Sequence, residues 1–178
     1  ACQAALDINQ ALAQLNSQFI EENYPQLQHR ISIVSGETIV GNFGSAERMV
    51  YSVIGRKVDD VQFVNQLNKR YATSIIICED TYQSVKDAFF VRKLDKIDTP
   101  SGAQNQAIYE LICRKNDPIV HQKLAFVKQY EAALEALLTK DYDKAEQDFM
   151  TLMTQYPDDE ATIYQMGLIF QMKQNQTR

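Results

Sequence analysis

The apolar pattern of this chain changes its period near residue 117. Before that point, short β-branched runs alternate with stretches in which apolar residues recur every three or four positions, as in strands interleaved with helices. After it, the stretches 121–138, 142–154 and 160–173 have helical spacing only. The pattern excludes an all-helical chain and favours an α/β or α+β unit at 1–117, followed by a helical segment at 118–178.

Local signals place the elements of the first unit. Helices are expected at 1–24, ended by Pro25, at 57–71, and at 80–88 with Asp80 as N-cap. Strands are expected at 31–34, 38–43, 49–54, 74–78, 89–94 and 108–112. Because three residues separate the first two runs, we predict that they form a hairpin. A helix that starts at residue 1 without a cap indicates a segment of a longer protein.

Composition excludes several classes of partner. The net charge is −5, from 18 basic and 23 acidic residues with no basic block, so nucleic acid is not an expected partner. No apolar run approaches the roughly 20 residues of a membrane span, and no membrane contact is expected from this segment. Cys2, Cys78 and Cys113 are far apart and lack zinc-ligand spacing, which predicts free thiols in a cytoplasmic protein.

The helical segment resembles a tetratricopeptide repeat, a helix-turn-helix unit of about 34 residues. Its stretch "KDYDKAEQDF" is similar to the segment between the two helices of that repeat. Ala145, Phe149 and Pro157 match repeat positions, and Met166, Gly167 and Phe170 match the start of a following repeat. Gln129 and Ala136 depart from it. Such repeats need neighbours to bury their faces, so the segment either packs on the preceding unit or belongs to a longer array.

Residues 1–113 resemble the C-terminal part of the class III nucleotidyl cyclase homology domain. The matching stretches, in order, are "ACQAALDINQALAQLN", "ISIVSGETIVGNFGS", "MVYSVIGRKVDDVQFVNQL" and "FFVRKLDKIDTPSGAQNQAIYEL". The resemblance implies a partial ferredoxin-like α+β sheet. It also implies descent from enzymes, classed as lyases, that convert ATP or GTP to the cyclic nucleotide and pyrophosphate.

The positions that carry chemistry in the family are substituted here. Ser52 occupies the position that reads the purine, where it retains a hydroxyl that can hydrogen-bond. Asp59 replaces the asparagine that orients the ribose, and Phe63 replaces the arginine that stabilises charge on the phosphates. Arg56 follows Gly55 where the family has Asp or Asn, and could pair with Asp59 or Asp60. Both Asp59 and Phe63 are therefore predicted to be non-functional.

The resemblance also implies what this chain lacks. The family holds a pair of Mg²⁺ or Mn²⁺ ions with aspartates on strands that precede the first helix seen here, and the adenine-selecting lysine lies there too. No metal ligands are predicted among these residues, because the side chains of Asp59 and Asp60 diverge on a helix. Since family active sites form between two domains, we expect a homodimer or a heterodimer with another cyclase domain. Unpaired sheet edges predict the same.

Three functions remain open at this stage. The first is a catalytically degenerate or incomplete cyclase segment, a pseudoenzyme that acts in assembly or regulation of signal transduction. The second is an active adenylate or guanylate cyclase that is completed by upstream residues or by a partner chain. The third is a protein-interaction module centred on the tetratricopeptide-like tail. Turnover by the isolated chain would contradict the first function, and the activity of a mixture with an active cyclase domain tests the second.

Overall fold

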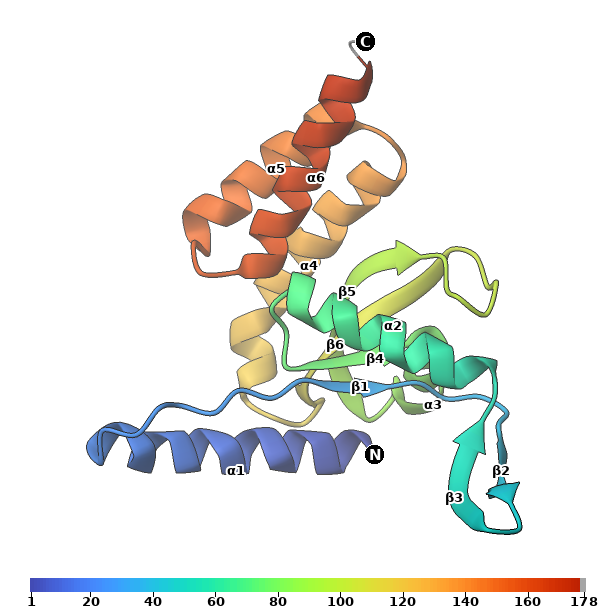
Figure 1. Ribbon diagram of the computed structural model, residues 1–178. Helices are drawn as coiled ribbons and strands as arrows, with labels where there is room; N and C mark the ends of the chain where they lie inside the picture. Colours follow the sequence, from blue (N-terminus) through green and yellow to red (C-terminus); the bar gives the residue numbers. More distant parts are fainter. Residues whose placement is uncertain (177–178) are drawn as a thin grey trace.

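The computed structural model describes residues 1–176 of the chain (Figure 1). The elements are α1 (Cys2–Glu21), β1 (Ile31–Ile33), β2 (Ile39–Ser45), β3 (Arg48–Ile54), α2 (Arg56–Arg70), β4 (Ile75–Cys78), α3 (Glu79–Val85), β5 (Phe89–Ile97), β6 (Gln106–Arg114), α4 (Ile119–Leu138), α5 (Tyr142–Gln155) and α6 (Glu160–Gln176). The mixture of strands and helices, with purely helical structure after β6, confirms the α+β class.

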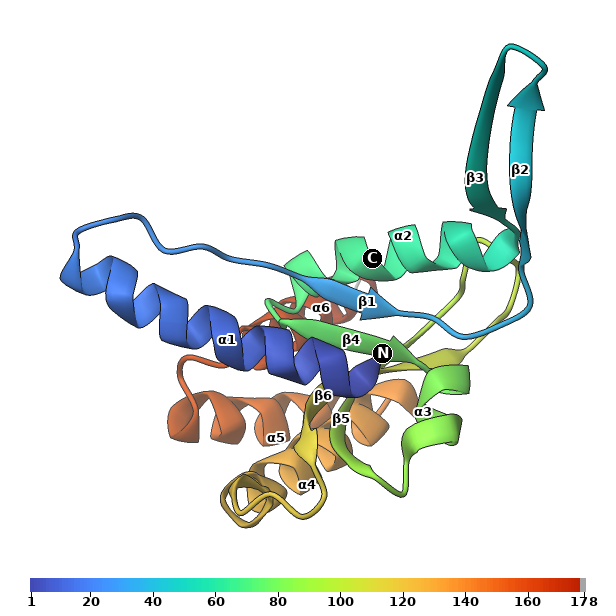
Figure 2. The same cartoon turned by 90° about the horizontal axis from the view of Figure 1, so that it is seen from below.

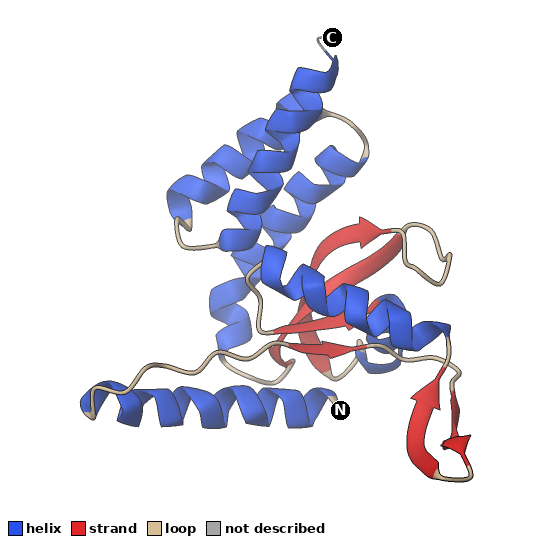
Figure 3. Cartoon of the chain, in the orientation of Figure 1, coloured by secondary structure: helices blue, strands red, loops and turns tan. Residues whose placement is uncertain are grey.

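The strands form two separate sheets (Figure 3). Four of them make the central sheet in the order β1-β4-β6-β5. In it β1 and β4 run parallel, whereas β4–β6 and β6–β5 are antiparallel. The other sheet is the hairpin of β2 and β3, which extends away from the body of the molecule. Strand β1 is therefore an edge of the central sheet.

Helices cover both faces of the central sheet (Figure 2). The side chains of Ile75 and Ile77 in β4 pack with α1 and α3 on one face. Ile76 points to the opposite face, where one continuous core runs from α2 across the sheet into α4, α5 and α6. All three isoleucines are at most 1% exposed, as the unbroken apolar run of this strand predicts.

The first helix is shorter and less buried than the sequence predicts. It ends at Glu21 rather than at Pro25, because Asn23 takes a left-handed conformation with φ of 59°. Only Cys2 and Ala5 of α1 are buried, although an apolar stripe continues along the helix. Farther along the helix its apolar side chains are exposed: Ile8, Leu15 and Ile20. The stripe is thus largely uncovered.

The predicted hairpin between the first two β-runs is wrong. β1 pairs instead with β4, so that Ile31 lies opposite Ile75. β2 pairs with β3 from Ile39–Ile54 to Ser45–Arg48, which leaves a two-residue turn. The reason is that the runs flanking this turn have matched seven-residue lengths, whereas residues 34–38 form an open link. The predicted N-cap is also wrong, since α3 begins before Asp80, at Glu79.

The helices α4 to α6 pack on the central sheet. Tyr130, Ala145 and Phe149 are completely buried, and the rings of Tyr130 and Phe149 meet edge to face at 5.5 Å. The α4 and α6 side chains also reach the edge strand β5, where the Tyr130 hydroxyl and the Gln165 amide both donate to the Leu94 carbonyl. Of the two arrangements expected for this segment, the structure therefore has the one in which it packs on the preceding unit.

Candidate functional site

The strand-to-helix turn between β3 and α2 is where the sequence places its candidate residues. Gly55 makes this turn with φ of 155° and ψ of 163°, a conformation that side-chain-bearing residues rarely adopt. Its carbonyl oxygen accepts the Val58 amide at 2.9 Å, which starts the helix. The conformation of Gly55 therefore sets the orientation of the hairpin relative to the start of α2.

The three predicted site residues lie in different environments around this turn. Ser52 is exposed in the middle of β3, opposite Gly41. Asp59 is exposed in the first turn of α2. Phe63, one helical turn later, is half-buried and packs against the larger hydrophobic core. Within residues 1–176, no side-chain hydrogen bond joins Ser52 or Asp59 to another residue, so the structure does not assemble these three side chains into one polar site.

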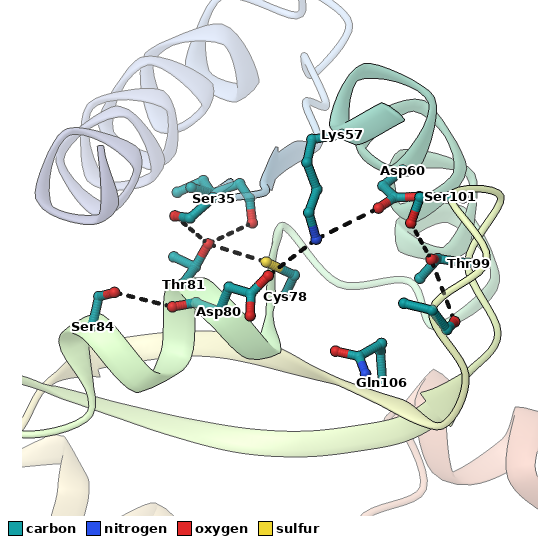
Figure 4. Close-up of polar contacts among 12 residues, drawn as sticks. Ser35, Lys57, Asp60, Cys78, Asp80, Thr81, Ser84, Thr99, Ser101 and Gln106 are labelled. Carbon is teal, nitrogen blue, oxygen red and sulfur yellow. Dashed lines mark hydrogen bonds and ion pairs between the residues drawn. The ribbon is translucent and has the colours of Figure 1, made fainter. Parts of the chain in front are cut away.

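The charged centre near the start of α2 is instead Lys57 (Figure 4). Its ammonium group lies 3.0 Å from an Asp80 oxygen of α3 and 3.7 Å from an Asp60 oxygen of α2. The hydrogen bond to Asp80 is the main cause that raises the pKa of Lys57. The expected ion pair of Arg56 with Asp59 or Asp60 does not form, since the adjacent Lys57 occupies that place.

A glycine makes room for this lysine. A Cβ atom built on Gly36 would lie 2.7 Å from both Cγ and Cε of Lys57, closer than carbon atoms can approach. The link between β1 and β2 thus lies directly against the aliphatic part of Lys57. As a result, one lysine holds together this link, the start of α2 and the start of α3, at the base of the hairpin.

Two further sets of hydrogen bonds surround the lysine. The hydroxyls of Ser35 and Thr81 are 2.9 Å apart, and Thr81 also donates to the Ile33 carbonyl at 3.3 Å. Asp60 is 2% exposed and accepts the Ser101 amide at 3.0 Å, which ties α2 to the loop between β5 and β6 (Figure 4). These contacts connect the sheet, both helices and the loop.

The space enclosed by this cluster is small. A cavity of about 10 Å³ lies between Lys57, Asp60, Asp80 and the neighbouring apolar side chains. That is about the volume one water molecule needs, and far below what a nucleotide needs. The cluster therefore stabilises the base of the hairpin and leaves no room for a substrate. The spacing of Lys57 and Asp60 in the sequence is compatible with an i,i+3 ion pair on a helix. The sequence does not indicate that Asp80 also binds Lys57.

The carboxylates near the turn do not fit a pair of divalent ions. Asp60 is directed into the protein, where it binds an amide and lies next to an ammonium group, while Asp59 faces outward on the adjacent helical position. In the part of the chain that the structure describes, no three His, Cys, Asp or Glu side chains are grouped to hold a metal ion. We therefore assign no step to a metal held by these residues.

Comparison with solved structures identifies the type of fold. The central sheet and its helices have a class III cyclase-like fold. The crystal structure of the adenylyl cyclase CyaB from P. aeruginosa aligns with 64% of this chain and 59% of its own, with a TM-score of 0.52 and 25% sequence identity. The α+β fold of this chain is thus similar to that of a nucleotidyl cyclase.

Sequence comparison leads to the same class. Over 112 residues the chain is 28% identical to "Adenylate cyclase 1" of Rhizobium meliloti (strain 1021), covering 63% of this chain and 17% of that protein. Over 143 residues it is 23% identical to "Adenylate cyclase, terminal-differentiation specific" of Dictyostelium discoideum, covering 79% of this chain and 7% of that protein. No family model matches. The chain therefore corresponds to a small part of each of these relatives.

The state of the cysteines and the hydropathy of the helices complete the description. Cys2 and Cys113 are buried free thiols, and burial is the main cause that raises the pKa of each. Cys78 is a half-buried free thiol beside Thr81. Among helices α1 to α6, as far as Gln176, none is both long and apolar enough to cross a membrane.

Proposed function

We propose that this chain is a segment of a class III nucleotidyl cyclase signalling protein that does not itself convert ATP or GTP, and that it acts in assembly or regulation. The observation that carries the proposal is the environment of Phe63. Its ring packs against the core at the position where the family resemblance places an arginine. A phenyl ring has no donor and no charge, so it cannot stabilise charge that develops on phosphates.

Asp59 supports the same reading from the neighbouring helical turn. Its exposed carboxylate replaces a neutral amide, and an ionised carboxylate repels a triphosphate. Losing one preorganised donor typically lowers a rate by about 10² to 10³, and here two positions are changed. Ser52 keeps a hydroxyl on the exposed hairpin, so a purine contact of the ancestral kind is the part of the site that this chain retains.

We infer an assembly role from the parts that are intact. The class III cyclase-like sheet, the hairpin and α2 are all formed, and the partner we propose is a second copy or another cyclase domain. The tetratricopeptide-like helices α4 to α6 are the part we propose as a contact for a further protein, in a cytoplasmic complex. The similarity to adenylate cyclases supports the proposal that the chain acts in signalling in which cyclic nucleotides are made.

The first experiment measures cyclic nucleotide formed from ATP and from GTP with Mg²⁺ or Mn²⁺. The isolated chain is expected to form none above the blank. Turnover by the isolated chain would mean that the substituted residues are compatible with catalysis, and the proposal would then be wrong. Turnover that arises only after mixing with an active cyclase domain, above that domain's own rate, would favour the completed-cyclase alternative.

The second experiment restores the family residues. The double variant Asp59→Asn, Phe63→Arg should bind ATP or GTP at least about tenfold more tightly than the parent, since a charge-assisted hydrogen bond contributes roughly 1.5 to 3 kcal/mol. The matched control is the double variant Gln62→Arg, Gln66→Lys, which makes the same change of +2 in charge at exposed positions of α2. Equal affinities for the double variant and the control would show that these positions do not face a nucleotide.

A further inference from the structure

A short region of β5 binds the helical segment, α4 to α6, through hydrogen bonds with donor–acceptor distances between 2.8 and 3.2 Å. These hydrogen bonds end on three consecutive residues of the strand: Arg92, Lys93 and Leu94. Their partners on the helical segment are polar side chains: Tyr130, Glu131, Asp159 and Gln165. Beside the shared apolar core, the two parts of the chain thus meet at a polar docking region, residues 92–94.

A bulge in β5 shapes this docking region. The pairing with β6 passes from Lys93–Tyr109 directly to Asp95–Ile108, so Leu94 is an extra residue without a partner in the ladder. Its carbonyl oxygen instead accepts one hydrogen bond from α4 and one from α6. Because a bulge redirects the groups of a strand away from the neighbouring strand, it presents this part of β5 to the helices.

The residue after the bulge connects the docking region to α2. Asp95 accepts the hydroxyl of Tyr71 at 2.6 Å. Tyr71 is the C-cap of α2 and is 3% exposed. Its ring also meets the ring of Tyr164 from α6 edge to face, with the centroids 5.0 Å apart. The C-terminal end of α2 is therefore held by β5 and by the helical segment together.

The other end of α2 is attached to the loop that follows β5. In this loop the Ser101 amide donates to the buried carboxylate of Asp60 at 3.0 Å. Figures 1 and 2 show that α2 runs from the hairpin to the base of the helical segment. Both ends of α2 are thus tied to β5 or to its loop, directly after the residues on which the helical segment docks. These contacts form one continuous physical connection.

The docking region itself contributes little to holding the segment in place. Arg92 is 2% exposed, and removing this cation and its carboxylate partners from water offsets much of their attraction. Gln165 is 0% exposed, and within residues 1–176 its side-chain oxygen has no hydrogen-bond partner. A buried carbonyl oxygen without a donor opposes docking. Both features reduce the free-energy difference between the docked arrangement and a released one, as a two-state switch requires.

We infer that the helical segment is a regulatory element that controls α2 through the bulge of β5, and that its release from residues 92–94 loosens both ends of α2. The inference rests on the proposed role in regulation and names the part that is regulated. α2 carries Asp59 and Phe63, and Gly55 joins it to the hairpin that carries Ser52. A protein bound to the helical segment thereby changes how these candidate residues are presented.

Hydrogen exchange of the full chain, measured by mass spectrometry, tests this coupling. Tyr164→Leu removes the ring contact of α6 with α2 and keeps an apolar side chain. Amides of residues 60–63, at the end of α2 that is distant from the substitution, are expected to exchange at least about tenfold faster, whereas those of β4 should change less than about twofold. The matched control is Tyr82→Leu on α3, a half-buried tyrosine that stacks on Tyr109 at 4.1 Å on the opposite face of the sheet.

Three results of this experiment would overturn the inference. They are faster exchange that stops at the last turn of α2, equal acceleration in β4, and the same pattern in the variant and the control. Glu131→Ala, which removes the acceptor of the Lys93 amide in the docking region, provides a second variant if Tyr164→Leu does not fold.

A native cysteine gives an independent measurement at the start of α2. Cys78 is half-buried and lines the small cavity beside Lys57 and Asp60, whereas Cys2 is buried on the opposite face of the sheet. Iodoacetamide should alkylate Cys78 at least about fivefold faster in Tyr164→Leu than in the parent, and Cys2 at an unchanged rate. An unchanged rate at Cys78, or equal acceleration at both cysteines, would contradict a release of α2.

The two proposals can fail separately. If the isolated chain makes cyclic nucleotide, the proposed loss of turnover is wrong, while hydrogen exchange still decides whether the helical segment controls α2. If exchange in α2 does not respond to Tyr164→Leu, the coupling is wrong, while the activity measurement still decides the proposed function.

Discussion

The guanidinium of Arg92 and the carboxylate of Asp159 join the central sheet to the helical segment through two hydrogen bonds of 2.8 and 2.9 Å. Arg92 also binds Glu110 on the neighbouring strand, and its guanidinium lies over the rings of Phe126 and Tyr130, 4.9 and 4.6 Å from their centroids. Burial alone would lower the pKa of Arg92, but Glu110 and Asp159 raise it, so the buried cation is stabilised by its partners. The sheet and the helices are thus linked by a desolvated ion pair.

Asp159→Asn is expected to lower the free energy of unfolding by about 3 kcal/mol, because it leaves the buried Arg92 with one carboxylate fewer. The same carboxylate also accepts the Thr162 amide at the start of α6, a cap that an asparagine oxygen can also make, so the loss is assigned to the ion pair with Arg92. Urea unfolding measures the change. The neighbouring variant Asp158→Asn is the control, since Asp158 is exposed and should shift stability by less than about 0.5 kcal/mol.

A loss of similar size in both variants would mean that the Arg92–Asp159 pair does not hold the helical segment in place. A loss confined to Asp159→Asn that comes with exposure of α4 to α6 alone, seen as faster hydrogen exchange in those helices, would mean that the helical segment unfolds before the sheet does.

The positions of most elements could be predicted from the sequence, because helical spacing and β-branched runs are local signals. β4 is the clearest case, where three adjacent isoleucines predict a strand covered on both faces. The pairing of β1 was not predictable in this way. Its partner lies 44 positions later in the sequence, and only the completed fold shows that β2 turns away to pair with β3.

In the candidate site, too, some features could be predicted from the sequence and others could not. The positions of Ser52 and Asp59 on a strand and on a helix followed from the sequence pattern. The pairing of Lys57 with Asp80, from two different helices, did not, because it depends on where α3 starts and on Gly36 leaving space for the lysine. The burial of Arg92 under α4 and α6 was unpredictable for the same reason, since its ligand Asp159 lies in another element.

Stability should fall in alkaline solution because of three buried tyrosines. Burial is the main cause that raises the pKa of Tyr71, Tyr109 and Tyr130 above the ordinary value of 10.0. Since the folded state favours the protonated hydroxyls, their contribution is complete below pH 10 and is lost as the pH rises above it. Each tyrosine contributes a slope of up to about 1.4 kcal/mol per pH unit to the free energy of unfolding.

Tyr71→Phe tests this dependence. It should lower stability at neutral pH by roughly 1 to 2 kcal/mol, since Asp95 loses a hydrogen bond of 2.6 Å, and it should reduce the loss of stability above pH 10 by the share of one tyrosine. Unfolding in urea at a series of pH values between 8 and 11 measures both effects. Tyr51→Phe, at an exposed position, is the control and should leave the alkaline slope unchanged.

The adjacent aspartates of α2 should differ sharply in their effect on stability. Asp60→Ala is expected to cost about 2 kcal/mol, because the Ser101 amide and the Lys57 ammonium group both lose a buried partner. Asp59→Ala should change stability by less than about 0.5 kcal/mol, because its side chain is exposed. Thermal or urea unfolding of the two variants measures the difference, and equal values would contradict the structural role assigned to Asp60.

Substitutions of two glycines of β2 test whether the conformation of the hairpin affects the stability of the rest of the molecule. Gly44 has φ of 138°, and a Cβ atom there would lie 2.0 Å from the Arg48 carbonyl oxygen. Gly44→Ala must therefore distort the end of the hairpin, whereas a Cβ atom on Gly41 meets no other atom within 4 Å. Because the hairpin lies outside both cores, Gly44→Ala should leave the Tm within a few degrees of the parent.

The effect of Gly44→Ala should instead be seen in assembly. If the hairpin takes part in the proposed assembly with a second copy or another cyclase domain, Gly44→Ala weakens that association at least tenfold, while Gly41→Ala changes it less. Sedimentation velocity over a range of concentrations measures the dissociation constants, and circular dichroism verifies that both variants are folded. Equal dissociation constants for Gly44→Ala and the parent would contradict this expectation. The clash of the added Cβ atom with the Arg48 carbonyl oxygen would then have no effect on assembly.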